Sequence, residues 1–109
     1  MREPWTILEV RELTEAAYLP VLRGEVSGRP VVKAEALRYA EERLPGRTHH
    51  TLKDRCYRIS EVLRDEGLPW VQGWKPPDMV GQTPNSAGVT EIIRAAALPL
   101  VRAEFGPAA

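Results

Sequence analysis

The sequence has a single cysteine, Cys56, among its 109 residues. One cysteine cannot form a disulfide within the chain, and a Cys-based zinc site needs further thiolates. A lone thiol is also typical of proteins from reducing compartments. We therefore expect a cytoplasmic protein, associated with the nucleoid if its source is bacterial or viral.

Long apolar stretches are missing as well. No run approaches the roughly 18 apolar residues of a membrane-spanning helix, and the start Met-Arg-Glu-Pro is unlike a signal peptide. We therefore expect no contact with a membrane.

Aromatic residues are few, at three Trp, three Tyr and one Phe, although hydrophobic residues make up 43% of the chain. The core must then consist mainly of Leu, Val, Ile and Ala. A chain of this length and hydrophobic fraction can bury one small core, so one compact unit is expected.

The chain has no net charge, because 15 Lys and Arg residues balance 15 Asp and Glu residues. This excludes a strongly basic nucleic-acid binder and makes the distribution of charge informative. Residues 29–64 contain nine basic and five acidic residues, whereas residues 1–28 and 65–109 each contain three basic and five acidic ones. The cationic part of the sequence is therefore its centre.

No pattern typical of an enzyme is present: we find no paired carboxylates, phosphate-binding loop or Ser-His-Asp arrangement. Cys56 lies on an apolar helical stripe, where a thiol behaves as a small hydrophobic side chain. His49 and His50 are adjacent, and adjacent side chains on a helix diverge by about 100°, which argues against a metal site. We predict no catalytic activity, no metal and no cofactor.

The chain is organised around residues 44–63, LPGRTHHTLKDRCYRISEVL. Pro45-Gly46 predicts a tight turn, and Thr48 is a suitable N-cap for a helix over residues 48–64 that ends before Gly67. One face of this helix is an apolar stripe with helical spacing. The stripe consists of Leu52, Cys56, Ile59 and Leu63.

The opposite face of this helix is polar and of mixed charge, and it includes Arg58 and Glu61. A polar helix face after a tight turn and a preceding helix is the arrangement that reads the DNA major groove. Four of its side chains can hydrogen-bond to base edges. These base-reading candidates are His50, Lys53, Asp54 and Tyr57.

Other residues of the turn and helix are candidates for phosphate contacts, which add affinity without sequence information. They are Arg47, Thr48, His49, Arg55, Arg58 and Arg64. Two alternatives stay open. For the base-reading candidates, the alternative is that the polar face is only solvated. For the phosphate candidates, the alternative is that Arg47 or Arg55 pairs with a glutamate at the edge of the core.

This stretch resembles the last helix of Myb/SANT-like domains and the turn before it. The resemblance lies in LPGRT at residues 44–48, followed by HHTLKDRC. Trp5-Thr6 with Glu9 and Leu13 is similar to the family's Trp-Thr-x-x-Glu-x-x-x-Leu opening. The similarity covers residues 4–59. The sequence departs from the family at Ala36 and Cys56, where the family has core aromatics, and in a longer link between the first two helices.

The resemblance implies a three-helix unit that binds double-stranded DNA, with base-contacting positions at His50, Lys53 and Asp54. Such a protein would be a small transcriptional regulator or an accessory factor of viral or mobile-element DNA metabolism. SANT-like relatives use the same helices to bind proteins, so a protein-interaction module without DNA binding is the alternative.

We predict an all-α fold in three parts. A Myb-like three-helix, helix-turn-helix unit covers residues 3–66, a segment rich in Pro, Gly and Trp covers residues 67–85, and a C-terminal helix covers residues 86–109.

Within the three-helix unit, the first helix is expected over residues 4–22, with Leu8, Ala16 and Leu19 facing the core and Pro20 ending or kinking it. Residues 23–29 are expected to form a loop. The second helix is expected over residues 30–44, with an apolar face of Val32, Ala36, Leu37, Ala40 and Leu44.

Residues 70–74 are expected to form a short strand or an extended arm. We expect Trp70 and Trp74 to be buried against the three-helix unit, because such large apolar rings favour burial; a stacking platform for nucleic acid is the alternative.

The C-terminal helix should be interrupted or kinked at Pro99. Its apolar stripe either packs within the chain, which we favour, or forms a homodimer. The stripe consists of Val89, Ile92, Ile93, Ala96, Ala97, Leu100 and Val101.

Overall fold

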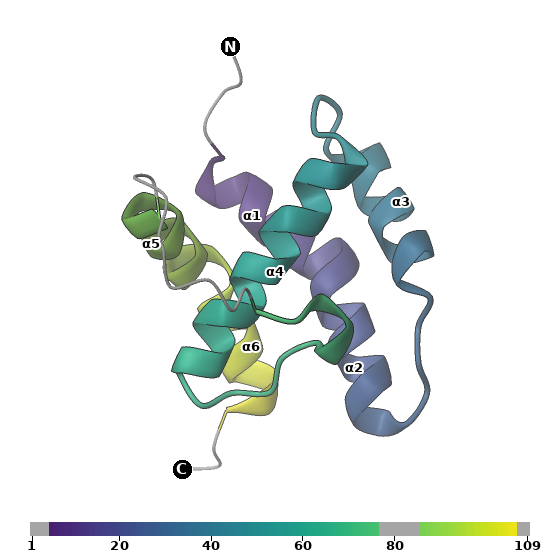
Figure 1. Ribbon diagram of the computed structural model, residues 1–109, viewed down its shortest axis with the longest axis vertical. Helices are drawn as coiled ribbons and strands as arrows, with labels where there is room; N and C mark the ends of the chain where they lie inside the picture. The colour runs from purple at the N-terminus through teal and green to yellow at the C-terminus, as the bar shows by residue number, and fades with distance from the viewer. Residues whose placement is uncertain (1–4, 77–85, 107–109) are drawn as a thin grey trace.

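The computed structural model describes residues 5–76 and 86–106, and over these residues its regular secondary structure is entirely helical. The all-α class is therefore confirmed. The elements in order are α1 (Ile7–Leu13), η1 (Thr14–Tyr18), α2 (Leu19–Ser27), α3 (Lys33–Arg43), α4 (His49–Asp65), η2 (Gln72–Trp74), α5 (Ser86–Ala96) and α6 (Leu98–Phe105) (Figure 1). None of the described helices is both long and apolar enough to cross a membrane.

The first three elements form one continuous helix, which begins at Ile7. A capping box sets this start. The side chain of Thr6 accepts a hydrogen bond from the Glu9 N–H at 3.1 Å, and the Glu9 carboxylate accepts one from the Thr6 N–H. The predicted start at residue 4 lies outside the described residues.

Pro20 lies inside this helix, so the prediction that it ends the helix is wrong. A proline in an α-helix has no N–H to donate, and its ring collides with the carbonyl four residues earlier, here that of Ala16. The preceding turn, η1, is a π-helix in which the Leu19 N–H reaches back five residues to the Thr14 carbonyl. This local change of hydrogen-bond register accommodates Pro20, and α2 continues to Ser27.

Gly24 is buried within α2, so the predicted loop over residues 23–29 is wrong for most of its length. The chain after α2 turns back across Gly24. A Cβ atom at residue 24 would lie 2.6 Å from the Arg29 carbonyl oxygen and 3.0 Å from Cγ2 of Val31. The glycine therefore permits a close approach inside a helix, where no side chain has room.

The second helix is also shorter than predicted. It begins at Lys33 instead of Pro30, and Val32 is its N-cap residue. Val32 is 57% exposed, so its predicted burial is wrong, whereas the rest of the predicted face is buried. Leu8 is likewise 72% exposed, against expectation. The buried side of α1 is defined by Val10 and Leu13, and Leu8 points about 200° away from Val10 around the helix.

The predicted turn and helix around α4 are confirmed. Gly46 has φ 98°, a left-handed conformation that suits glycine in the tight turn. The Thr48 side chain caps α4 by accepting a hydrogen bond from the Thr51 N–H at 3.2 Å. The predicted apolar stripe of Leu52, Cys56, Ile59 and Leu63 is completely buried.

The segment after α4 contains the short 3-10 helix η2 at Gln72–Trp74, so the predicted strand at residues 70–74 is wrong, whereas Val71 before η2 is extended. Trp74 is only 2% exposed, which confirms its predicted place in the core, and Trp70 is half-buried. A buried hydroxyl group fixes this segment to the helices. The Tyr18 hydroxyl accepts the Val71 N–H at 3.0 Å and lies 2.5 Å from the Ser60 hydroxyl.

Of the C-terminal helices, α5 packs against α1 and α4 (Figure 1), and α6 packs against α5 and pairs with α2 through Glu104 and Arg23. The C-terminal helix is interrupted at Ala97, between α5 and α6 and two residues before Pro99, as predicted. Ile93, Ala96 and Val101 are buried in this contact. Four of the seven stripe residues, including Ala97, are thus buried within the chain, and the other three are partly buried against the core. The predicted parts at residues 3–4, 77–85 and 107–109 lie outside the described residues.

Candidate nucleic-acid interface

The helix-turn-helix consists of α3, the turn at residues 44–48 and α4. A hydrogen bond from the Arg47 N–H to the Leu44 carbonyl, 3.1 Å long, closes the turn. Its left-handed Gly46 and the Thr48 cap then set where α4 begins. The result is a helix whose N-terminal half presents its polar side to solvent.

The four predicted base-reading residues lie on one face of α4. His50, Lys53 and Asp54 are exposed, and Tyr57 is half-buried at the edge of the core. The spacing from His50 to Tyr57 is two helical turns, or about 10 Å along the axis. This length corresponds to about three base-pair steps of 3.4 Å.

Lys53 contacts Tyr57 one turn further along α4. Its Nζ atom lies 6.0 Å from the centre of the Tyr57 ring. Within residues 5–76 and 86–106, no carboxylate lies within ion-pair distance of Lys53. Lys53 thus carries an exposed positive charge on the candidate face.

Arg47 occupies a different environment, against the start of α1. Its guanidinium binds both carboxylate oxygens of Glu9, at 2.9 Å from Nε and 2.7 Å from Nη2. It also lies 4.7 Å from the centre of the Trp5 ring, and the Arg47 side chain is only 6% exposed. The hydrogen bond from Arg47 lowers the pKa of Glu9. Arg47 therefore takes the alternative role that we considered, pairing with a glutamate of another helix, and is not placed to meet a phosphate.

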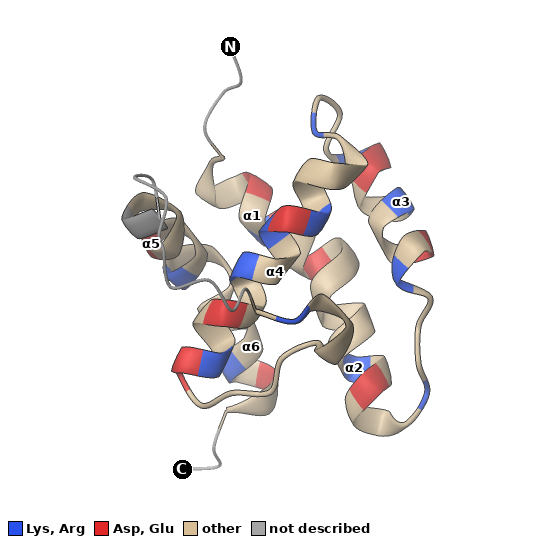
Figure 2. Cartoon of the chain, in the orientation of Figure 1, with Lys and Arg blue, Asp and Glu red and all other residues tan. Residues whose placement is uncertain are grey.

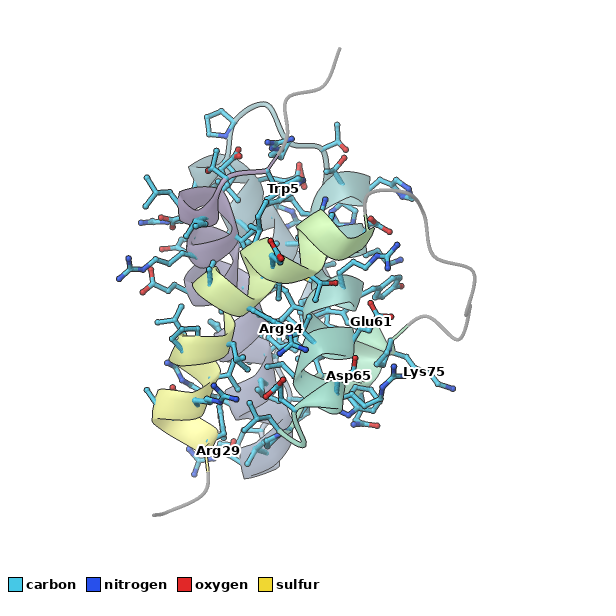
Figure 3. The ribbon with its side chains drawn as sticks, turned by 90° about the vertical axis from the view of Figure 1, so that its left-hand side faces the viewer. Trp5, Arg29, Glu61, Asp65, Lys75 and Arg94 are labelled. Carbon is cyan, nitrogen blue, oxygen red and sulfur yellow. The ribbon has the colours of Figure 1, made fainter. Side chains whose placement is uncertain are left out.

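Arg55 approaches the same tryptophan from α4, with its guanidinium 5.0 Å from the centre of the Trp5 ring (Trp5 is labelled in Figure 3). Arg55 is half-buried, and its Nε has no hydrogen-bond partner among the described residues. Removal from water lowers the pKa of this guanidinium. Arg55 is therefore mainly a packing partner of Trp5.

The remaining phosphate candidates have partners within the chain. Thr48 caps α4, and its Oγ1 lies 2.8 Å from Oγ1 of Thr51. The Nδ1 atom of His49 lies 3.3 Å from a Glu41 carboxylate oxygen.

Two arginines further along α4 are ion-paired. Arg58 is half-buried and contacts Glu61 at 3.4 Å, whereas Arg64 contacts Asp65 at 3.5 Å in an exposed pair. Exposed pairs of this kind contribute at most about 1 kcal/mol and exchange easily with other anions. Arg64 and His49 are thus the more accessible phosphate candidates.

Ion pairs between distant segments neutralise part of the positive charge that the sequence concentrates in residues 29–64. Glu9 and Glu12, from the acidic first segment, pair with Arg47 and Arg43 of the central segment. Figure 2 shows acidic and basic residues interspersed along α4. The candidate face is therefore of mixed sign and not strongly cationic.

The sequence left open that Arg47 pairs with a glutamate, but it did not identify Glu9 as that partner. A local signal for Glu9 exists, since a Thr followed three residues later by Glu is the pattern of a capping box. Its second contact, with Arg47, spans 38 residues and has no such signal.

Three further observations concern metal binding, the thiol of Cys56 and a surface cavity. No group of three or more His, Cys, Asp or Glu side chains comes together in the described part of the chain. Cys56 is completely buried, and burial raises the pKa of its thiol. A surface cavity between α2 and α6 contains no residue of α4, and its polar lining includes Arg23 and Glu104, which are paired with each other.

Comparison of the chain with protein-family models, with curated proteins and with solved structures finds no match in any of the three. The resemblance to Myb/SANT-like domains therefore rests on the residues quoted above.

Proposed function

We propose that this protein binds double-stranded DNA with the N-terminal half of α4 in the major groove. The observation that carries the proposal is the exposed polar face of α4, directly after the turn that joins it to α3. His50, Lys53 and Asp54 lie on that face within one and a half turns. The proposed role is that of a small transcriptional regulator or of an accessory factor in viral or mobile-element DNA metabolism.

The chemistry of the face favours G·C base pairs. A lysine ammonium donates hydrogen bonds to O6 and N7 of guanine, and a carboxylate accepts one from N4 of cytosine. Lys53 and Asp54 are adjacent on the exposed side of α4. We expect these two residues to discriminate among base pairs, at about 1–3 kcal/mol for each good contact.

The proposal is tested by binding of the protein to a pool of mixed duplexes over a range of salt concentrations. Each phosphate contact releases condensed counterions, so the affinity should fall as salt is raised. Because several arginines are already paired with carboxylates, we expect a shallower salt dependence than for a strongly basic binder. An absence of duplex binding even at low salt contradicts the proposal.

A specific observation favours a second function, a protein-interaction module without DNA binding. Arg58 and Arg64 of α4 are paired with Glu61 and Asp65, so this helix has less free positive charge than a phosphate-binding surface usually offers. Under this alternative, the same face of α4 binds a folded protein partner and does not bind duplex DNA.

A further inference from the structure

Among the basic residues of α4, Arg58 and Arg64 form ion pairs and the half-buried Arg55 packs on Trp5, whereas Lys53 is exposed and lies beside the Tyr57 ring. Tyr57 is half-buried and packs against the core, which restricts the orientations of its ring. Lys53 is exposed, and its Nζ lies 6.0 Å from the ring centre, at the outer limit of a cation–π interaction. The flexible side chain thus lies against a support that the core holds in place.

A neutral ring restrains a cation without cancelling its charge. The carboxylates of Glu61 and Asp65 both hold and neutralise the arginines that they contact. An ammonium beside an aromatic ring keeps its full charge, and its N–H groups on the solvent side stay available as donors. A restrained lysine also loses less side-chain entropy when it binds, which favours the complex.

We infer that Tyr57 is a positioning residue, whose ring holds the Lys53 ammonium ready to donate to O6 and N7 of guanine, and whose hydroxyl reads no base. The DNA part of this inference rests on the proposed function. The ligand is accordingly a duplex with a G·C pair opposite Lys53, and discrimination for guanine depends on the ring of residue 57 and not on its hydroxyl group.

The contact itself is tested in the free protein by NMR. A nearby ring shifts the resonances of the Lys53 side-chain protons upfield. We expect this ring-current shift in the wild type and in Tyr57→Phe, and its loss in Tyr57→Leu, a substitution that keeps an apolar contact with the core. Lys33, on α3, serves as an internal control. Unshifted Lys53 resonances in the wild type overturn the inference whether or not DNA is bound.

Discrimination is tested with a duplex selected from a randomised pool by the wild type, and with a copy in which the G·C pair opposite Lys53 is replaced by A·T. Tyr57→Phe should keep the wild-type ratio of the two affinities, whereas Tyr57→Leu should reduce it about two- to fivefold. On a Lys53→Ala background, Tyr57→Leu should have no further effect on the ratio.

Two results overturn the inference in different ways. An equal loss of discrimination in Tyr57→Phe and Tyr57→Leu shows that the hydroxyl reads a base, and an unchanged ratio in Tyr57→Leu shows that the ring positions nothing. If no duplex is bound at all, the proposed function fails together with the role in reading guanine. In that case the NMR experiment still decides whether the ring restrains Lys53.

Discussion

Arg47 connects the turn before α4 with the first turn of α1, because its guanidinium binds both oxygens of Glu9 and lies over Trp5. The residue follows directly on Gly46, so the same few residues shape the turn and attach it to the rest of the core. The position at which α4 leaves the turn therefore depends on a contact with the start of α1.

We predict that Arg47→Ala destabilises the fold by about 2–3 kcal/mol, because it leaves the Glu9 carboxylate without its partner and uncovers Trp5. Urea unfolding followed by Trp fluorescence measures the loss. Arg64→Ala is the matched control, since its pair with Asp65 is exposed, and it should change the free energy of unfolding by less than about 1 kcal/mol. Equal effects of the two substitutions contradict the structural role of Arg47.

The same contact predicts a pH dependence. Because the pKa of Glu9 is lower in the folded protein than in the unfolded chain, its ionised form stabilises the fold. This contribution is complete above the ordinary pKa of about 4.3 and is lost as the pH falls through the lowered value. Glu9→Gln should therefore reduce stability at neutral pH and have a smaller effect below about pH 3. A loss of the same size at both pH values argues against this linkage.

The Tyr18 hydroxyl makes a second long-range connection, since it accepts the Val71 N–H and pairs with Ser60 inside the core. Tyr18→Phe leaves these buried groups without a partner, and we expect a loss of about 1–3 kcal/mol. Tyr39→Phe is the control, because Tyr39 is 49% exposed and its hydroxyl only contacts Arg43. Urea unfolding of both variants provides the comparison, and a smaller loss for Tyr18→Phe than for Tyr39→Phe would refute this account of the η2 segment.

Among the elements, α4 was predictable from sequence and the first helix was not, for physical reasons. The turn, the cap and the apolar stripe of α4 are all local features of about 20 residues, and they agree with one another. The length of the first helix depends instead on the π turn before Pro20 and on the chain that crosses Gly24, and both are set by tertiary packing. The exposed polar face was predicted with α4. The pairing of Arg47 with a glutamate was left open, since only the folded chain brings Glu9 beside it.

Alanine substitution of Gly24 tests the close packing around α2, and the same substitution of Gly88 in α5 is the control. Gly24→Ala should destabilise the fold by about 1–3 kcal/mol, because the new Cβ meets the backbone carbonyl of Arg29. Gly88→Ala in α5 meets no atom of the described residues within 4 Å and should stabilise the fold by about 0.5–1 kcal/mol, as expected for alanine in a helix. Thermal unfolding separates the two, and a stabilising Gly24→Ala is incompatible with the close approach described here.

At the scale of the whole molecule, one hydrophobic core joins the helix-turn-helix to the C-terminal helices. Ile93 of α5 is completely buried, and α5 packs on both α1 and α4. Further connections lie at the surface, where Glu66 after α4 pairs with Arg94 and Arg102 (Arg94 is labelled in Figure 3). The residues after α4 thus complete the unit that presents the candidate DNA-binding face.

We therefore predict that Ile93→Glu unfolds a monomeric protein, since a buried, unpaired carboxylate costs about 3–5 kcal/mol. Ala95→Glu, at an exposed position of the same helix, should remain folded. Sedimentation and circular dichroism of both variants beside the wild type measure the outcome. A wild-type dimer that Ile93→Glu divides into folded monomers would make the C-terminal helices an assembly surface instead.

The central claim, that α4 enters the major groove, is tested most directly by NMR titration of the amide resonances with duplex DNA at low salt. We predict the largest shifts in residues 48–58 and smaller ones in α6, which lies away from the exposed face of α4. Lys53→Ala should reduce the preference for the selected duplex over random DNA. Shifts that are absent, or that are centred on any element other than the turn and α4, contradict the account.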